Sequence, residues 1–362
     1  MKKLFLIPLI FVLAVGLVLG GCGEPAEPTT PAEPTKPAEP EVIELKFAHW
    51  MPPPSTIPHF IYDPWVEELS ERTNGRLKVT LFGGGVMGKP PDHLELALSG
   101  TADISFIDAA AFTGVFPLFE AQTLPMLYPT SEVAAATSWD LIQKYMVDTE
   151  FKEVKVLFTQ PTGMRQITTA KKPVHVLEDL EGMKIGTTSS MMAKGLEVLG
   201  AVPVIQSPGD LYTSLERGLV DGVESNWEAT FGTWKYYDVT KYRTDGINLG
   251  VSGPMVIMNL DSWNNLPPDI QKIIDETSGP VLSRKTGALF DELCAQMLEK
   301  IEEYDKQVGN PEVYYLPAAE RARWKAAIQP MLDAWVADKE AAGLPGKALM
   351  ADLLALVEKY SK

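Results

Sequence analysis

Hydrophobic and polar residues alternate along several short stretches of the chain, a pattern that is typical of β-strands. The first two stretches are IELKFAHW at 43–50 and LKVTLFG at 77–83, and a helical stripe at 59–76 lies between them. A short helix is predicted at 92–103, before a third strand at 104–108. This strand–helix–strand–helix–strand order predicts the first half of an open, mostly parallel α/β fold.

A similar pattern follows in a second half of the chain. Strands at 154–161 and 165–170 are predicted to leave the first half. The next predicted elements are, in order, strand 183–186, helix 190–199, strand 201–206, helix 209–222 and strand 220–223. The stretch 251–267 is expected to return to the first half as a strand, and 269–309 and 317–361 are helical in pattern. Two α/β halves joined by crossing strands predict a hinged, two-lobed protein.

The N-terminus has the features of a bacterial lipoprotein signal. The chain begins MKK, and an unbroken apolar run follows at 4–20. The run leads into LGGC, which places Cys22 at the lipidated position of a lipobox. We therefore predict a signal peptide at 1–21 and a lipid on Cys22. An uncleaved anchor and a buried free cysteine are the alternatives.

A Pro- and Glu-rich stretch follows, and residues 22–41 as a whole are predicted to be the lipidated cysteine and an extended tether. Such a segment has too few apolar side chains to build a core. With a lipid at its start, it would hold a globular body at the outer face of the cytoplasmic membrane, or in the periplasm.

Charge and residue types narrow the function further. The formal net charge is −16, which argues against binding to nucleic acid or to anionic lipid surfaces, although a local pocket can still hold an anion. Cys294 is the one cysteine besides Cys22, so no internal disulfide is expected. The four histidines show no metal-binding spacing, and no nucleophile motif is present. We expect no metal, no cofactor and no catalytic residue.

Several ordered blocks carry a resemblance to a known family. They are AHWMPPPS (48–55), GRLKVTLF (75–82), LALSGTADISF (96–106), LPMLY (124–128), GMRQITTAKKPVHVLEDLEGMKIG (163–186) and LYTSLERGLVDGVES (211–225). Over 43–335 the chain resembles the solute-binding proteins of tripartite ATP-independent periplasmic (TRAP) transporters, of the DctP type. The last two blocks are the most specific.

The resemblance implies a periplasmic-binding-protein-like α/β fold with two lobes, hinge strands and a long C-terminal helical region that spans both lobes. On this basis lobe I is expected at 42–160 and lobe II at 161–250. Residues 251–362 supply the return strand and the packing helices. The implied function is capture of a small, carboxylate-bearing organic acid in a closing cleft and its delivery to the membrane subunits of a TRAP permease.

The family's ligand device is an arginine clamp, because a guanidinium donates two parallel bonds to a carboxylate. By resemblance, Arg165 in GMRQITT matches the family's first arginine. A hinge-side salt bridge is the alternative role for Arg165. The family's second arginine ends the pattern Gly-x-Lys-Ile-Arg, and here that position is Gly186. This departure weakens the inference of a C4-dicarboxylate.

Four hydroxyl residues follow Gly186 and could replace the missing arginine. Thr187, Thr188, Ser189 and Ser190 stand where a strand leads into the helix predicted at 190–199. The first amides of a helix lack partners and attract anions. Gly186 is interpreted as opening space for a ligand beside the main chain. The alternative is that Thr188 or Ser189 merely caps the helix.

Other candidates follow the ends of predicted strands, where ligands of open α/β sheets bind. Trp50 follows the first strand, and the strand at 220–223 is followed by Glu224, Ser225, Asn226 and Trp227. Trp50 and Trp227 are expected to form aromatic walls. By family position, Ser225 is expected to contact the ligand.

Two other functions stay open at this point. A receptor of this kind could serve a sensor or signalling partner without transport, which the gene neighbourhood would reveal. An extracytoplasmic enzyme, for example a lyase, would need an acid–base pair in the cleft. Asp108 or Glu224 with His49 are the candidates for that pair.

Overall fold

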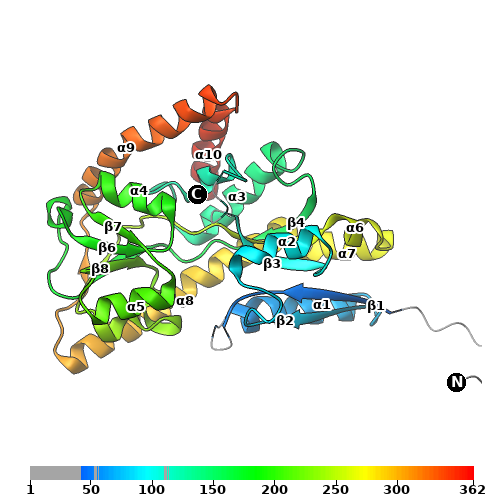
Figure 1. Cartoon of the computed structure of the whole chain (residues 1–362), viewed down its shortest axis with the longest axis horizontal. Coiled ribbons are helices and arrows are strands. Elements are labelled where there is room, and N and C mark those ends of the chain that lie inside the picture. The colour runs from blue at the N-terminus through cyan, green and yellow to red at the C-terminus, as the bar shows by residue number, and fades with distance from the viewer. Residues whose placement is uncertain (1–41, 53–54, 56, 110–111, 113) are drawn as a thin grey trace, which may run out of the picture. The chain divides into compact units, whose positions relative to one another are not determined.

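The computed structural model describes residues 42–362 apart from 53–54, 56, 110–111 and 113. The predicted signal peptide at 1–21, the lipidation site at Cys22 and the tether to residue 41 lie outside the described residues. Within the described part the strands form two separate sheets, named sheet A and sheet B below (Figure 1).

Sheet A has five strands, which are β1 (Ile43–Ala48), β2 (Leu77–Phe82), β3 (Ile104–Asp108), β4 (Val154–Thr159) and β10 (Pro254–Asn259). Their order is β2–β1–β3–β10–β4. β1 is parallel to β2 and β3, whereas β10 runs antiparallel between β3 and β4. Central β10 is buried at every position, while buried residues alternate with exposed ones at the start of edge strand β2.

Sheet B has six strands, which are β5 (Gln166–Thr169), β6 (Lys184–Thr187), β7 (Val202–Ile205), β8 (Gly222–Ser225), β9 (Tyr242–Asp245) and β11 (Tyr314–Tyr315). Their order is β11–β9–β5–β8–β6–β7. β6 is parallel to β7 and β8, and β5 is antiparallel to β8 and β9. The chain therefore passes from sheet A to sheet B after β4 and returns after β9.

Helices pack on each sheet. Those around sheet A are α1 (Asp63–Arg72), α2 (His93–Leu98), α3 (Ser131–Tyr145), α6 (Leu260–Asn264) and α7 (Pro268–Thr277). Those on sheet B are α4 (Ser190–Val198) and α5 (Pro208–Glu216). Short 3-10 or π turns are η1 (Pro58–Tyr62), η2 (Pro90–Asp92), η4 (Phe119–Thr123), η5 (Leu177–Leu180), η6 (Glu228–Thr233) and η7 (Tyr236–Val239).

The C-terminal helices contact the elements of both sheets. Helix α8 (Gly279–Val308) packs against α3 and β4 at sheet A and against η6 beside sheet B. Helix α9 (Ala318–Ala341) packs on α4, and α10 (Gly346–Tyr360) packs on α3. A Cβ at Gly287 would lie 2.5 Å from the Ser131 carbonyl oxygen, so glycine permits the close contact of α8 with α3. The predicted two-lobed α/β fold is confirmed.

Several elements differ from the sequence prediction. Strand β8 ends at Ser225, so Glu224 and Ser225 belong to the strand instead of following it. Helix α3 was not predicted, because it is buried on several faces and its Ala-rich sequence shows no single apolar stripe. Strand β9 was missed because it is short and carries the buried, charged Arg243.

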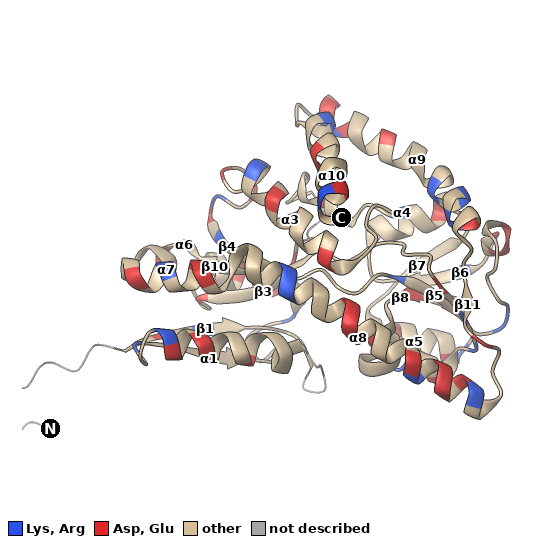
Figure 2. Ribbon diagram, turned by 180° about the vertical axis from the view of Figure 1, so that it is seen from behind, with Lys and Arg blue, Asp and Glu red and all other residues tan. Residues whose placement is uncertain are grey.

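Charged residues are spread over the surface helices. Figure 2 shows acidic and basic positions interspersed along α8 and α9. Among the helices of the described residues, none has both the length and the hydropathy of a membrane span.

Candidate ligand-binding site

A cavity of about 270 Å³ is lined by residues from both sheets. Trp50 and Met51 lie just beyond β1, Asp108 ends β3, and Glu224 and Ser225 end β8. The cavity therefore lies at the carboxyl ends of these strands, where open α/β sheets bind ligands. Its volume is near the lower end of the range for small-molecule sites, roughly 300–1,000 Å³.

Arg165 lies on the segment that crosses from sheet A to sheet B. Its amide donates to the Gly250 carbonyl at 2.8 Å, and its carbonyl accepts from the Leu249 amide at 2.9 Å. Residues 249 and 250 belong to the segment that returns to sheet A, so the two crossing segments pair at Arg165. The residue is 7% exposed and lines the cavity. Arg165 is thus fixed at the junction of the two lobes.

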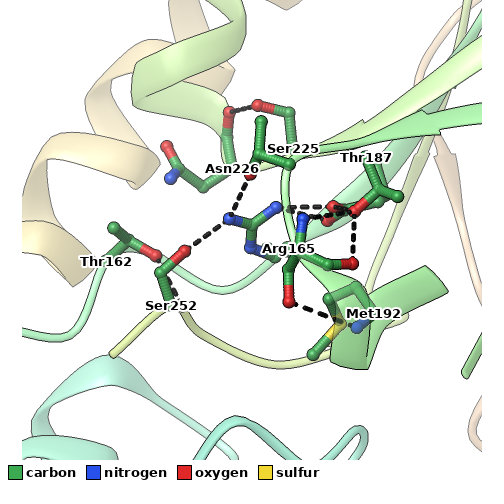
Figure 3. A network of polar contacts seen from close by, with 10 residues as sticks. Thr162, Arg165, Thr187, Met192, Ser225, Asn226 and Ser252 are labelled. Carbon is green, nitrogen blue, oxygen red and sulfur yellow. Dashed lines mark hydrogen bonds and ion pairs between the residues drawn. The ribbon is translucent and has the colours of Figure 1, made fainter. Parts of the chain in front are cut away.

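The guanidinium of Arg165 has a different partner on each side (Figure 3). Nη1 donates to both carboxylate oxygens of Glu224, at 2.6 and 2.7 Å. Nη2 donates to the hydroxyls of Thr188, at 3.3 Å, and of Ser252. Burial by itself would lower the pKa of Arg165, but Glu224 and Asp108 outweigh it, so the pKa is raised. Arg165 therefore keeps its positive charge in the site.

Glu224 is bound within the protein. Besides Arg165, it accepts a hydrogen bond from the Thr187 hydroxyl at 2.5 Å, and its side chain is 0% exposed. The alternative considered for Arg165, a salt bridge, is therefore present. Nη1 is occupied by the Glu224 carboxylate, whereas the acceptors at Nη2 are the neutral hydroxyls of Thr188 and Ser252, two residues that line the cavity. A ligand carboxylate could replace these hydroxyls as the acceptor at Nη2.

The hydroxyl run after β6 divides into separate roles. Thr187 is buried against Glu224 and also accepts from the Ser189 amide at 3.1 Å. Ser189 is the N-cap of α4 and accepts from the Met192 amide at 3.3 Å. Of the run, Thr188 lines the cavity. Of the four hydroxyl residues expected to hold an anion, one therefore lines the cavity.

The interpretation of Gly186 is corrected by the structure. A Cβ at this position would lie 2.4 Å from Leu211 Cδ2 and 3.1 Å from Val223 Cγ1. Leu211 of α5 fills this space and itself lines the cavity, while Gly186 does not. The glycine therefore allows α5 to pack closely against sheet B, instead of opening room for a ligand.

The aromatic walls also differ from expectation. Trp50 lines the cavity, with its ring 5.1 Å from that of Phe106. Trp227 does not line the cavity, because its Nε1 donates to Asp245 at 2.7 Å and its ring packs with Ile301 and Val313. Trp234, seven residues later, takes the wall position. Helical turn η6 sends the two tryptophans in different directions.

Ser225 and Asn226 both line the cavity. The Asn226 side chain accepts from the Ala229 amide at 2.8 Å and so holds the start of η6. The Ser225 hydroxyl donates to the Asn226 carbonyl at 3.4 Å.

His49 lies away from the cavity. It is buried against Tyr62, with ring centroids 5.3 Å apart, and against Gly83. Burial, assisted by nearby His93, lowers the pKa of His49 to about 4. The acid–base pair required by the enzyme alternative is therefore not brought together, although Asp108 and Glu224 line the cavity.

Sequence reasoning missed several cavity residues, among them the polar residues Glu228, Tyr236 and Ser252. Glu228 and Tyr236 follow the end of β8 in short turns, whose side-chain directions have no sequence period. Ser252 comes from the returning segment, which was predicted to be strand.

Among the described residues, no group of three or more His, Cys, Asp or Glu side chains could hold a metal ion. Burial raises the pKa of the Cys294 thiol to about 12.

The two lobes, the crossing segments and the interlobe cavity define a solute-binding protein. The chain belongs to the bacterial extracellular solute-binding proteins, family 7 (DctP), whose model matches residues 47–339. Members of this family are binding proteins. The family predicted from the sequence blocks is confirmed.

Solved structures and curated relatives that are similar to this chain agree with this family assignment. A TRAP solute-binding protein from Rhodoferax ferrireducens, in complex with copurified benzoate, has a TM-score of 0.81 and 28% identity, covering 88% of this chain and 99% of that chain. A marine-metagenome protein specific for aromatic acid ligands, in complex with metahydroxyphenylacetate, has a TM-score of 0.79 and 27% identity, covering 89% and 100%. The C4-dicarboxylate-binding periplasmic protein DctP of Rhodobacter capsulatus is 28% identical and covers 81% of this chain, which covers 86% of that protein.

Proposed function

We propose that this chain is an extracytoplasmic receptor, anchored by a lipid at Cys22, that captures a small aromatic carboxylate and delivers it to a TRAP permease. The observation that carries the proposal is the cavity in which Arg165 Nη2 and two hydroxyls lie among aromatic side chains. A single donor group suits one carboxylate. Trp50, Phe106 and Trp234 supply apolar wall area for a ring.

The departure at position 186 supports a ligand with one carboxylate. Arg165 is the one Lys, Arg or His side chain among the described residues that line the cavity. Leu211 occupies the space beside Gly186, so apolar surface lies next to the position where the resemblance implies the family's second arginine. The two structural neighbours named above hold benzoate and metahydroxyphenylacetate, both ring acids with one carboxylate.

Lobe closure would couple binding to delivery. The cavity walls come from both sheets, and the crossing segments that join the sheets pair at Arg165. A ligand that touches both walls binds the closed form better than the open form and shifts the equilibrium by that difference.

Binding affinity of the full chain in mild detergent tests the proposal. Calorimetry with benzoate, 3-hydroxyphenylacetate and succinate is expected to show binding of the two ring acids and weaker binding of succinate. Arg165→Met in a Glu224→Gln background, which leaves no unpaired buried carboxylate, is expected to weaken ring-acid binding about 100-fold, since charge-assisted hydrogen bonds contribute about 1.5–3 kcal/mol each.

Exposed Arg217 of the same lobe provides the matched control, and Arg217→Met is expected to leave affinity unchanged. Full retention of ring-acid affinity in the Arg165→Met/Glu224→Gln protein would refute the assignment of Arg165. We also propose that binding involves no chemistry. Solute recovered unchanged by NMR after prolonged incubation agrees with that statement, and a converted product contradicts it.

A further inference from the structure

The charges around the cavity are unbalanced. The described residues that line it include one guanidinium, on Arg165, and three carboxylates, on Asp108, Glu224 and Glu228. The undescribed residues beyond position 41 are Pro, Thr and Ala, so they add no charge. With every group ionised, the lining has an excess of two negative charges. A receptor for a simple acid anion would be expected to have the opposite balance, because like charges in a closed site repel.

Glu228 is a cavity carboxylate with no cationic partner among the described residues. It is 7% exposed and lines the cavity from turn η6. Its Oε1 accepts from the Thr233 hydroxyl at 2.7 Å. No lysine, arginine or histidine nitrogen of the described residues lies within 4.0 Å of it. Burial raises the pKa of Glu228, which reflects the cost of a buried carboxylate without a cationic partner.

The remaining donors and walls show which groups a ligand can satisfy. Arg165 Nε is buried and has no hydrogen-bond partner among the described residues, although the residue lines the cavity. The indole Nε1 of Trp50 is likewise buried and unpaired. Both donors suit an acceptor such as a carboxylate. Trp50, Trp234 and Tyr236 also present aromatic side chains to the cavity, and such rings attract cations by about 0.5–2 kcal/mol.

We infer that the preferred solute is a zwitterion that carries a protonated amine as well as the carboxylate and ring of the proposed function. The carboxylate binds on the Arg165 Nη2 side with Thr188 and Ser252, and the ammonium binds Glu228, with Asp108 adding negative potential. This inference rests on the proposed function, because it assigns the carboxylate to the same guanidinium. It adds that the amine is recognised, which makes the ligand class that of aromatic amino acids.

Three compounds of one skeleton test the inference on the full chain. They are phenylalanine, in both the L and D forms, 3-phenylpropionate, which lacks the amine, and phenethylamine, which lacks the carboxylate. Calorimetry is expected to show that one phenylalanine enantiomer binds at least tenfold more tightly than 3-phenylpropionate. A phenylpropionate affinity equal to or above that of both enantiomers would overturn the inference and leave the proposed function standing.

Charge-removing variants assign the effect to Glu228. Glu228→Gln keeps the side-chain volume and an acceptor for Thr233. It is expected to weaken phenylalanine binding at least tenfold and to leave 3-phenylpropionate binding equal or tighter. Glu216→Gln, at an exposed position of α5, is the control and should change neither. Equal loss for both compounds would mean a structural role for Glu228 and would refute the inference. Failure of every carboxylate to bind would instead refute the proposed function.

Discussion

Two buried arginine–carboxylate pairs, both attached to sheet B, differ in what surrounds them. Arg165 pairs with Glu224 at the cavity, and Arg243 of β9 pairs with Asp305 of α8 at 3.1 Å. The Arg243 and Asp305 side chains are 0% and 1% exposed, and neither residue lines the cavity. Both arginines are therefore buried. The two pairs differ because Arg165 lines the cavity and Arg243 does not.

The hydrogen bonds explain this difference. Arg243 Nη1 donates to the hydroxyls of Thr168 and Thr240, and Nη2 donates to the carbonyls of Tyr237 and Thr240 as well as to Asp305. Burial lowers the pKa of Arg243 against the opposing effect of Asp305, whereas the pKa of Arg165 is raised. The Arg243 pair joins β9 to α8. A buried arginine thus indicates a ligand site only when part of its donor set faces a cavity.

The largest effect is expected from Arg243→Met. Removing one partner of a buried pair leaves an unpaired Asp305 carboxylate, so the free energy of unfolding should fall by about 3–5 kcal/mol. Urea unfolding followed by circular dichroism measures this change. Replacement of both partners, Arg243→Met with Asp305→Leu, is expected to recover most of the loss. If Arg243→Met lowered the ligand affinity of the folded protein as much as loss of Arg165 does, the distinction between the two arginines would be wrong.

A smaller effect is expected at position 186. Gly186→Ala places a Cβ against Leu211, and overpacking of this kind costs about 1–3 kcal/mol. Thermal unfolding should show the loss, and the added change Leu211→Ala should restore part of it. If Gly186→Arg instead produced a stable protein with tighter ring-acid binding, a second clamp would fit here, and Arg165 would no longer be the single ligand cation.

The smallest effect is expected from variants of Trp50, which lines the cavity, and of Trp227, which does not. Trp50→Phe should reduce the ligand-induced change in intrinsic fluorescence, because Trp50 and Trp234 are the two tryptophans of the described residues that line the cavity. Trp227→Phe should keep that change and keep affinity within about twofold. It should lower the free energy of unfolding by about 1 kcal/mol through loss of the bond to Asp245. If Trp227→Phe reduced the ligand-induced fluorescence change and Trp50→Phe did not, Trp227 would have to be placed in the ligand site.

Much of the fold could be predicted because its strands and most helices follow local rules. Period-two alternation located β1 and β2, and the helical stripe expected between them at 59–76 contains α1. Helix α3 escaped because burial on several faces removes the apolar stripe on which such predictions depend. Within the site, Trp50 and Arg165 were found because each follows a strand end or a family block.

The partners of each site residue could not be predicted in the same way. Glu224 was expected at the cleft, yet its bond to Arg165 joins residues 59 positions apart. The space beside Gly186 was assigned to a ligand, and it belongs to Leu211 of a neighbouring helix. Glu228 and Trp234 lie in a turn whose irregular geometry decides which side chain enters the cavity.

By itself, the sequence determined the α/β class, the family and the presence of an arginine at the crossing between lobes, because these depend on local periodicity and on contiguous motifs. Only the tertiary structure decided that Glu224 occupies Nη1 of that guanidinium and that Trp227 points away from the cavity. It also decided that Glu228 lines the cavity with no cationic partner in the described part of the chain. The physical reason is that charge balance and burial are properties of groups brought together from distant positions, and no local pattern encodes them.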